Sequence, residues 1–120
     1  MYLNIGEATQ VKHIQNEFNS VYPFLKIDFL KERAVNKKLL QKAEKVNPDD
    51  KILTTGIKIN IGRQRTVAQL KNDLKQMLGL TAEVFRKSGN MLWIETSLTD
   101  DWTLEQQNNE GELISLHNIQ

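Results

Sequence analysis

The chain has 120 residues, of which 39% are hydrophobic and 26% charged, with no cysteine and a formal net charge of +1. This composition excludes an intrinsically disordered chain, a disulfide-stapled fold, thiolate catalysis and cysteine-ligated metal sites, and its length suits one domain with one core. No apolar run reaches membrane-spanning length and the N-terminus lacks a signal-peptide pattern, so we expect a cytoplasmic protein with no membrane partner.

The charge is divided unevenly along the chain. Residues 1–94 carry all sixteen Lys and Arg against nine acids, which gives +7, whereas residues 95–120 carry six acids and no Lys or Arg, which gives −6. Such an asymmetry can mark a surface for nucleic acid or for an acidic partner. The simpler interpretation is an acidic tail that packs against its own basic body.

Residues 2–31 predict a strand, a helix and a second strand. The helix is indicated by four apolar residues at helical spacing, Val11, Ile14, Phe18 and Val21. The second strand is indicated by the alternating apolar residues Leu25, Ile27 and Phe29. Residues 32–46 then predict an inserted basic helix, because Val35, Leu39, Ala43 and Val46 keep a helical spacing before Asn47-Pro48.

Residues 57–87 predict a second strand, helix and strand. Ile57, Ile59 and Ile61 alternate with polar residues. The helix is expected behind a capping box of Thr66 and Gln69, and Gly79 suits a left-handed C-terminal cap. The last strand, 82–87, forms a hairpin with 91–96 across Ser88-Gly89-Asn90.

The acidic C-terminal segment predicts one short helix. Thr103 and Gln106 form a second capping box, and Gly111 indicates a stop after one or two turns. Residues 112–120 are apolar enough for either a docked strand or a frayed end.

The two strand–helix–strand units resemble each other at an offset of 56 residues, with Asn4-Ile5-Gly6 matching Asn60-Ile61-Gly62. We therefore predict one α+β domain, 1–120, with a ferredoxin-like split βαβ sandwich: one four-stranded antiparallel sheet with both helices on one face. Its parts are repeat 1 (about 2–31), the inserted helix (about 32–46), repeat 2 (about 57–87), and a hairpin strand with the acidic segment (90–120). Thr81 and Glu83 match inward-facing apolar residues, which predicts a one-residue gap near Gly79.

Residues 84–111, VFRKSGNMLWIETSLTDDWTLEQQNNEG, resemble the closing segment of a group of small uncharacterised bacterial proteins. In that group, phrases of the form VFRKSGN, a tryptophan strand and TDDWTLEQQN recur. The resemblance covers this segment closely and the N-terminal half loosely, and it implies no activity.

No catalytic constellation is present. His13 and His117 lie far apart without ligand-spaced partners, and the serines occupy no nucleophile-elbow pattern. We expect no metal, no cofactor and no enzymatic activity.

The outer face of the predicted sheet is the main candidate for binding. Its interaction residues are expected to be Tyr2, Phe85, Met91 and Trp93, with Trp102 as an apolar anchor in the tail. Three occupants are open: the acidic tail, a second subunit, or single-stranded RNA, although the RNP1 pattern is absent. We expect a non-enzymatic interaction module that binds a protein partner or itself, through this face or through an edge strand.

The alternative function is weak nucleic-acid or polyanion binding. A capped helix start beside a glycine and two arginines, residues 62–66, could present N–H groups and guanidinium groups to a phosphate. The candidate contacts are Arg33, Lys37, Lys38, Lys42, Lys45, Arg63 and Arg65.

Overall fold

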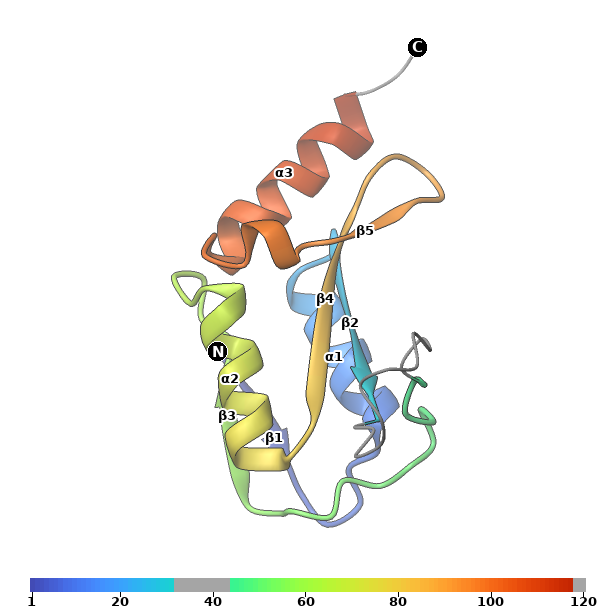
Figure 1. Cartoon of the computed structure of the whole chain (residues 1–120), viewed down its shortest axis with the longest axis vertical. Coiled ribbons are helices and arrows are strands. Elements are labelled where there is room, and N and C mark those ends of the chain that lie inside the picture. The colour runs from blue at the N-terminus through green and yellow to red at the C-terminus, as the bar shows by residue number, and fades with distance from the viewer. Residues whose placement is uncertain (32–43, 118–120) are drawn as a thin grey trace, which may run out of the picture.

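The computed structural model describes residues 1–31 and 44–117 of the chain (Figure 1). The elements run in the order β1 (Tyr2–Ile5), α1 (Val11–Val21), β2 (Leu25–Leu30), β3 (Ile57–Asn60), α2 (Val67–Leu78), β4 (Thr81–Lys87), β5 (Trp93–Glu95), the 3-10 helix η1 (Ser97–Thr99) and α3 (Leu104–His117). The predicted α+β class is confirmed, as are both strand–helix–strand units and the hairpin. The inserted helix falls on residues 32–43, which lie outside the described residues, apart from its last three positions.

Those last positions, 44–46, are extended instead of helical. The Lys31 N–H donates to the Glu44 carbonyl (2.8 Å), and the Val46 N–H donates to the Phe29 carbonyl (2.8 Å). Lys45 forms an isolated antiparallel bridge with Leu30. The segment therefore lies along the edge of β2, where it satisfies backbone groups that the end of this strand would otherwise leave open.

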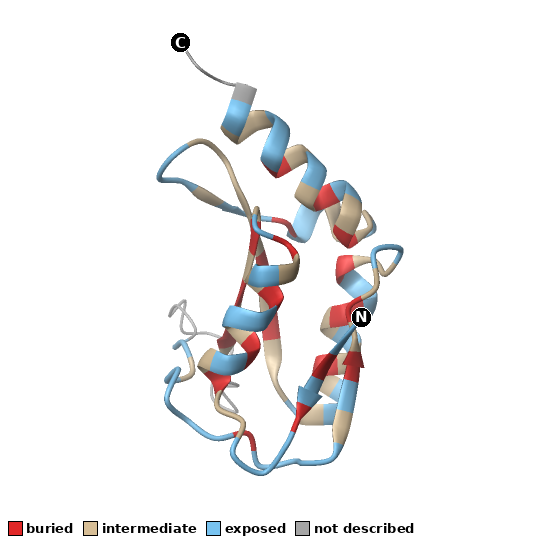
Figure 2. Cartoon of the chain, turned by 180° about the vertical axis from the view of Figure 1, so that it is seen from behind, coloured by how far each residue is buried: buried red, intermediate tan, exposed pale blue. Residues whose placement is uncertain are grey.

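The strands of the described residues form two sheets. β1 pairs with β3 in one, and β2, β4 and β5 pair in that order in the other; all the pairs are antiparallel. α1 and α2 lie on opposite sides of the molecule, α2 nearer the viewer in Figure 1 and α1 nearer in Figure 2. The ferredoxin-like prediction, one four-stranded sheet with both helices on one face, is not confirmed.

Each strand of one repeat pairs with its counterpart in the other. Leu3 lies opposite Ile59, 56 residues later, and Ile27 lies opposite Val84, 57 residues later. An antiparallel pair has a local two-fold axis at its centre, so one approximate two-fold axis between the repeats accounts for both sheets. The step from 56 to 57 confirms the predicted one-residue gap, and it coincides with a helix that has eleven residues in the first repeat and twelve in the second.

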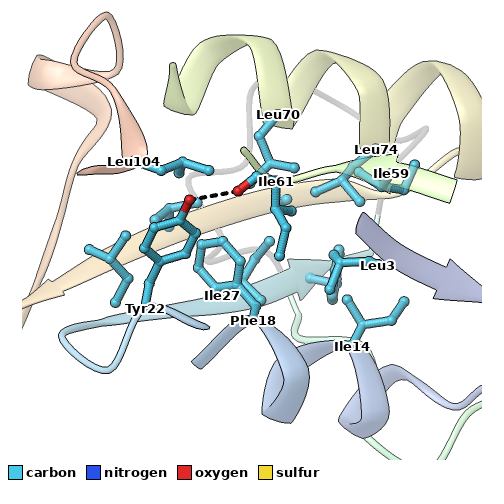
Figure 3. Close-up of a cluster of buried hydrophobic side chains, with 14 of the residues drawn as sticks. Leu3, Ile14, Phe18, Tyr22, Ile27, Ile59, Ile61, Leu70, Leu74 and Leu104 are labelled. Carbon is cyan, nitrogen blue, oxygen red and sulfur yellow. Dashed lines mark hydrogen bonds between the residues drawn. The ribbon is translucent and has the colours of Figure 1, made fainter. Parts of the chain in front are cut away.

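The core lies between the two sheets and is closed by the helices (Figure 3). Figure 3 labels its main side chains: Leu3, Ile14, Phe18, Tyr22, Ile27, Ile59, Ile61, Leu70, Leu74 and Leu104. The Tyr22 hydroxyl donates a buried hydrogen bond of 2.6 Å to the Ile61 carbonyl. This bond joins the end of α1 to the residue that follows β3, and so connects the two repeats.

The helix ends of the second repeat form as predicted. Thr66 Oγ1 accepts from the Gln69 N–H (3.1 Å) and Gln69 Oε1 accepts from the Thr66 N–H (2.9 Å). Gly79 caps α2 in the left-handed region, with φ of 68°. His13 has a similar local role, since its Nδ1 accepts from the Gln10 N–H (3.0 Å) at the start of α1.

α3 differs from its prediction in length. The capping box of Thr103 and Gln106 is confirmed, but the helix continues past Gly111 to His117 and replaces the strand or frayed end expected at the described positions 112–117. A Cβ at Gly111 would lie 2.9 Å from Phe24 Cβ and 3.1 Å from the Phe24 carbonyl oxygen. Gly111 therefore allows close packing of a continuing helix and does not end it.

Candidate interaction surface

The β4–β5 hairpin carries most of the predicted interaction residues. Gly89 turns the chain with φ of 85°, and the Ser88 N–H donates to the Leu92 carbonyl (2.8 Å). Arg86 then lies opposite Ile94, and Lys87 lies opposite Trp93. Because side chains alternate along a strand, Phe85 and Arg86 of β4 face opposite sides of the sheet.

The outer side of this sheet brings together two of the predicted residues, Phe85 and Trp93. Lys26 of β2 lies opposite Phe85, and its Nζ is 5.3 Å from the centre of the Phe85 ring and 5.2 Å from that of Trp93. A cation over an aromatic ring contributes about 0.5–2 kcal/mol, depending on solvent exposure. The side chain that lies against both rings is thus a lysine of the same sheet.

Tyr2 and Trp102 lie elsewhere, and Met91 lies in the connection of the hairpin. Tyr2 belongs to β1 in the two-stranded sheet, where it is half exposed. Met91 precedes β5 and is 87% exposed. Trp102 lies 5.5 Å from the guanidinium of Arg86, on the side of β4 opposite Phe85. The five residues therefore do not form one surface.

The tail packs against the Arg86 side of β4. Arg86 Nη1 donates to Oε1 of the fully buried Gln107 (2.9 Å), whose Nε2 donates to the Thr99 carbonyl (2.7 Å). The Phe24 N–H donates to Asn108 Oδ1 (2.9 Å). These contacts place α3 on the face of the sheet opposite to Phe85. The hydrogen bonds that attach α3 are made largely by neutral polar groups.

A different set of apolar residues is exposed at the end of the molecule formed by β5, η1 and α3, the upper end in Figure 1. Of the ten large hydrophobic residues that are exposed in the described part of the chain, six belong to this stretch: Met91, Leu92, Ile94, Leu98, Leu113 and Leu116. We call these six residues the apolar end. Leu98 is 98% exposed and Leu92 65% exposed. Such a concentration of exposed apolar side chains is typical of an interaction site.

Of these six residues, Met91 alone was predicted, because an outer face with Met91 and Trp93 leaves the alternating residues Leu92 and Ile94 on the side that faces the helices. Their side is correct, since Ile94 lies opposite Arg86, but the hairpin extends beyond the part of the sheet that α1 and α2 cover (Figure 2). The available signal was the run of four apolar residues from Met91 to Ile94, which breaks strict alternation. A strand with apolar residues on both faces predicts burial on both.

Of the three predicted anion contacts that the structure describes, Arg63, Arg65 and Lys45, two are engaged by the protein itself. Arg65 forms an ion pair with Asp73, and Lys45 forms one with Asp28 (3.2 Å). The first N–H groups of α2 are also used: Val67 donates to the Trp102 carbonyl (3.1 Å) and Ala68 to the Asp100 carbonyl (2.8 Å). The other predicted basic residues, Arg33, Lys37, Lys38 and Lys42, lie outside the described part of the chain.

Arg63 is exposed and lines a small polar cavity of about 200 Å³ together with Tyr22, Glu105, Asn108 and Asn109. Burial raises the pKa of the Tyr22 hydroxyl; the Arg63 guanidinium lowers it and the Glu105 carboxylate raises it further. The Glu105 carboxylate also accepts a bond from Gln64 Nε2 (3.2 Å). Glu105 is thus an acidic neighbour of Arg63 at this cavity.

Among the described residues, Glu83 is the second group with a shifted pKa. Burial raises the pKa of its carboxyl, the Lys71 ammonium at 3.8 Å lowers it, and the neighbouring Glu95 carboxyl raises it. The described residues contain no group of three or more His, Asp or Glu that could hold a metal ion. Within the same part of the chain, no helix is both long and apolar enough to cross a bilayer.

Comparison of the chain with protein-family models, with curated proteins and with solved structures finds no match.

Proposed function

We propose that this chain is a non-enzymatic protein-interaction module that associates with a second copy of itself through the apolar end. The observation that supports the proposal is that six of the ten large hydrophobic residues exposed within residues 1–31 and 44–117 lie in β5, η1, α3 and the two residues before β5. Removing a leucine side chain from water stabilises a complex by about 1.5–3 kcal/mol. A partner that covers several of these side chains would gain enough to offset part of the entropy cost of association.

A second copy is the partner that this surface favours. Most soluble oligomers are homo-oligomers, and a two-fold interface needs only one self-complementary patch. The apolar end takes its six residues from β5, η1, α3 and the pair before β5, so two copies can cover one another's apolar side chains.

Sedimentation equilibrium of the whole chain tests the proposal. We expect a concentration-dependent dimer, and we expect Leu92→Ser and Leu98→Ser to weaken it by about tenfold or more for each leucine that the dimer buries. Leu53→Ser is the matched control, because Leu53 is 95% exposed and lies in the segment 44–56 at the opposite end of the molecule (Figure 1). A monomer at the highest concentration, or a dimer that the control weakens equally, would overturn the proposal.

Weak polyanion binding is the alternative function, and the geometry adds no support to it. Arg65 and Lys45 have acidic partners, and the first N–H groups of α2 donate to backbone carbonyls. Binding through the remaining basic residues would show a steep loss of affinity with salt.

A further inference from the structure

The edge of β5 is open along its outer side. The sheet order is β2-β4-β5, so β5 has one strand neighbour, and Figures 1 and 2 show no other described segment beyond it. The bonds from the Ser88 N–H to the Leu92 carbonyl and from the Thr96 N–H to the Val84 carbonyl mark the hydrogen-bonded positions of the hairpin. Hydrogen-bonded and non-hydrogen-bonded pairs alternate along an antiparallel ladder. Ile94 therefore turns its N–H and C=O groups toward β4, and Trp93 and Glu95 turn theirs outward.

Apart from its short length of three residues, this edge lacks most of the features that usually prevent strand pairing. Natural edge strands are protected by lysine, proline, a bulge or a covering segment. Residues 91–95 contain no proline and no lysine, and Glu95 is their one charged residue. Met91 and Leu92 are well exposed and Ile94 is 39% exposed. The edge thus combines backbone donors and acceptors that point outward with apolar side chains that are exposed to water.

We infer that β5 pairs edge to edge, antiparallel, with β5 of a second copy, and this inference rests on the proposed self-association. A two-fold pairing of this segment can be centred on Trp93, Ile94 or Glu95. Centring on Glu95 sets two carboxylates directly opposite one another, which is destabilising. Centring on Ile94 sets Trp93 against Glu95 of the second copy.

Centring on Trp93 gives the best complementarity. The two Trp93 residues then form a hydrogen-bonded pair, which uses their outward N–H and C=O groups. Leu92 lies opposite Ile94 of the second copy, and the two-fold axis repeats this contact, so four aliphatic side chains meet on one face. No like charges lie opposite each other in this register. The pairing joins the two three-stranded sheets into one of six strands and removes the open edge.

Single-cysteine variants test this register, because the chain contains no cysteine and any disulfide must join the introduced residues of two copies. Only the residue on the two-fold axis meets its own copy, and a disulfide requires Cα atoms about 4.4–6.8 Å apart. We expect Trp93→Cys to form a disulfide-linked dimer under mild oxidation about tenfold faster than Ile94→Cys or Glu95→Cys. In those two variants the cysteines of the two copies are displaced from one another along the strands, by about 3.4 Å for each residue. Leu53→Cys, at the opposite end, gives the rate of random collision.

Glu95→Pro supplies a second measurement that keeps Trp93. The N–H of Glu95 turns outward, so proline there leaves the β4–β5 hydrogen bonds intact and removes one donor from the edge. We expect this variant to keep its circular dichroism spectrum and to lose the dimer in sedimentation.

The outcomes separate the inference from the proposed function. A wild-type dimer whose three β5 cysteine variants link no faster than Leu53→Cys would overturn pairing through β5 and leave self-association standing. Fastest linkage at Ile94→Cys would overturn the Trp93-centred register. A wild-type chain that stays monomeric at every concentration would overturn both. The same result is expected if the β5 edge pairs with a strand of another protein and not with a second copy.

Discussion

Glycine is favoured at positions 79 and 111 for different physical reasons. Gly79 has φ of 68°, which a residue with a Cβ adopts at a cost, but open space surrounds the position of that Cβ. Gly111 lies inside α3, where any residue fits the backbone, but its Cβ would press on Phe24 and on Arg86 Cγ (3.1 Å). One glycine is required by conformation and the other by contact.

Substitutions at the two positions should therefore respond differently to side-chain choice. Gly79→Ala is expected to lower the free energy of unfolding by about 1–2 kcal/mol, and Gly79→Asn by less, because asparagine tolerates the left-handed region. Gly111→Ala is expected to lower it by about 1 kcal/mol, since a packing cost of about 1–3 kcal/mol exceeds the helix-propensity gain of about 1 kcal/mol. Urea unfolding of each variant measures these differences.

Asn109→Ala is the control for α3, because Asn109 is exposed on the same helix. A change of about 0.5 kcal/mol or less is expected there. If Gly111→Asn proved as stable as the wild type, the close approach to Phe24 would have no energetic meaning.

The N-termini of α2 and α3 cap each other. The Leu104 N–H donates to the Arg65 carbonyl (2.8 Å) and the Val67 N–H donates to the Trp102 carbonyl (3.1 Å), while Thr66 and Thr103 form an antiparallel bridge. Each helix start thus supplies carbonyl acceptors for the orphan N–H groups of the other. This exchange attaches α3 to the second repeat, and it occupies the donors that an anion would need.

We expect Thr66→Ala and Thr103→Ala each to lower the free energy of unfolding by about 1 kcal/mol, because each removes the side-chain acceptor of a capping box. The two losses should not add: the double variant should differ from their sum by about 0.5 kcal/mol or more, since the two segments hold one another. Chemical unfolding of the single and double variants gives this coupling. Thr54→Ala, at an exposed position outside both segments, serves as the neutral comparison, and full additivity would show that the caps act independently.

Features encoded within a few residues could be predicted from the sequence. The capping box of Thr66 and Gln69 and the left-handed cap at Gly79 depend on local geometry alone, and both are confirmed. The length of α3 could not be predicted, because a glycine that ends a helix and a glycine that allows close packing look the same until Phe24 is placed beside it. The exchange of caps between residues 63–66 and 100–103 likewise depends on two distant segments meeting.

Strand pairing was beyond the reach of the sequence for a similar reason. The pattern of buried residues fixes which side of each strand faces the core, and this was correct for Ile27 and Val84. It does not fix which strand lies alongside, because one four-stranded sheet and two sheets bury the same residues. The pairing of each strand with its own counterpart is a property of how the two repeats dock. The exposed hairpin also belongs to this level, since the reach of α1 and α2 decides whether Leu92 and Ile94 are covered.

The hydrogen bond from Tyr22 to Ile61 joins the two repeats, and Tyr22→Phe should weaken their docking at neutral pH. The variant leaves a buried carbonyl without its donor, which costs about 1–3 kcal/mol.

Burial raises the pKa of Tyr22 in the folded chain, so the folded state holds the phenolic proton more tightly than the unfolded state. The stability that this group contributes is therefore complete below the ordinary tyrosine pKa of about 10 and is lost as pH rises above it. We expect the difference in unfolding free energy between wild type and Tyr22→Phe to be constant from neutral pH to about pH 9 and to narrow at higher pH. Tyr2→Phe, at a half-exposed position in β1, should show no such narrowing in the same urea titrations, and a difference that stayed constant through the alkaline range would mean that the hydroxyl does not couple the repeats.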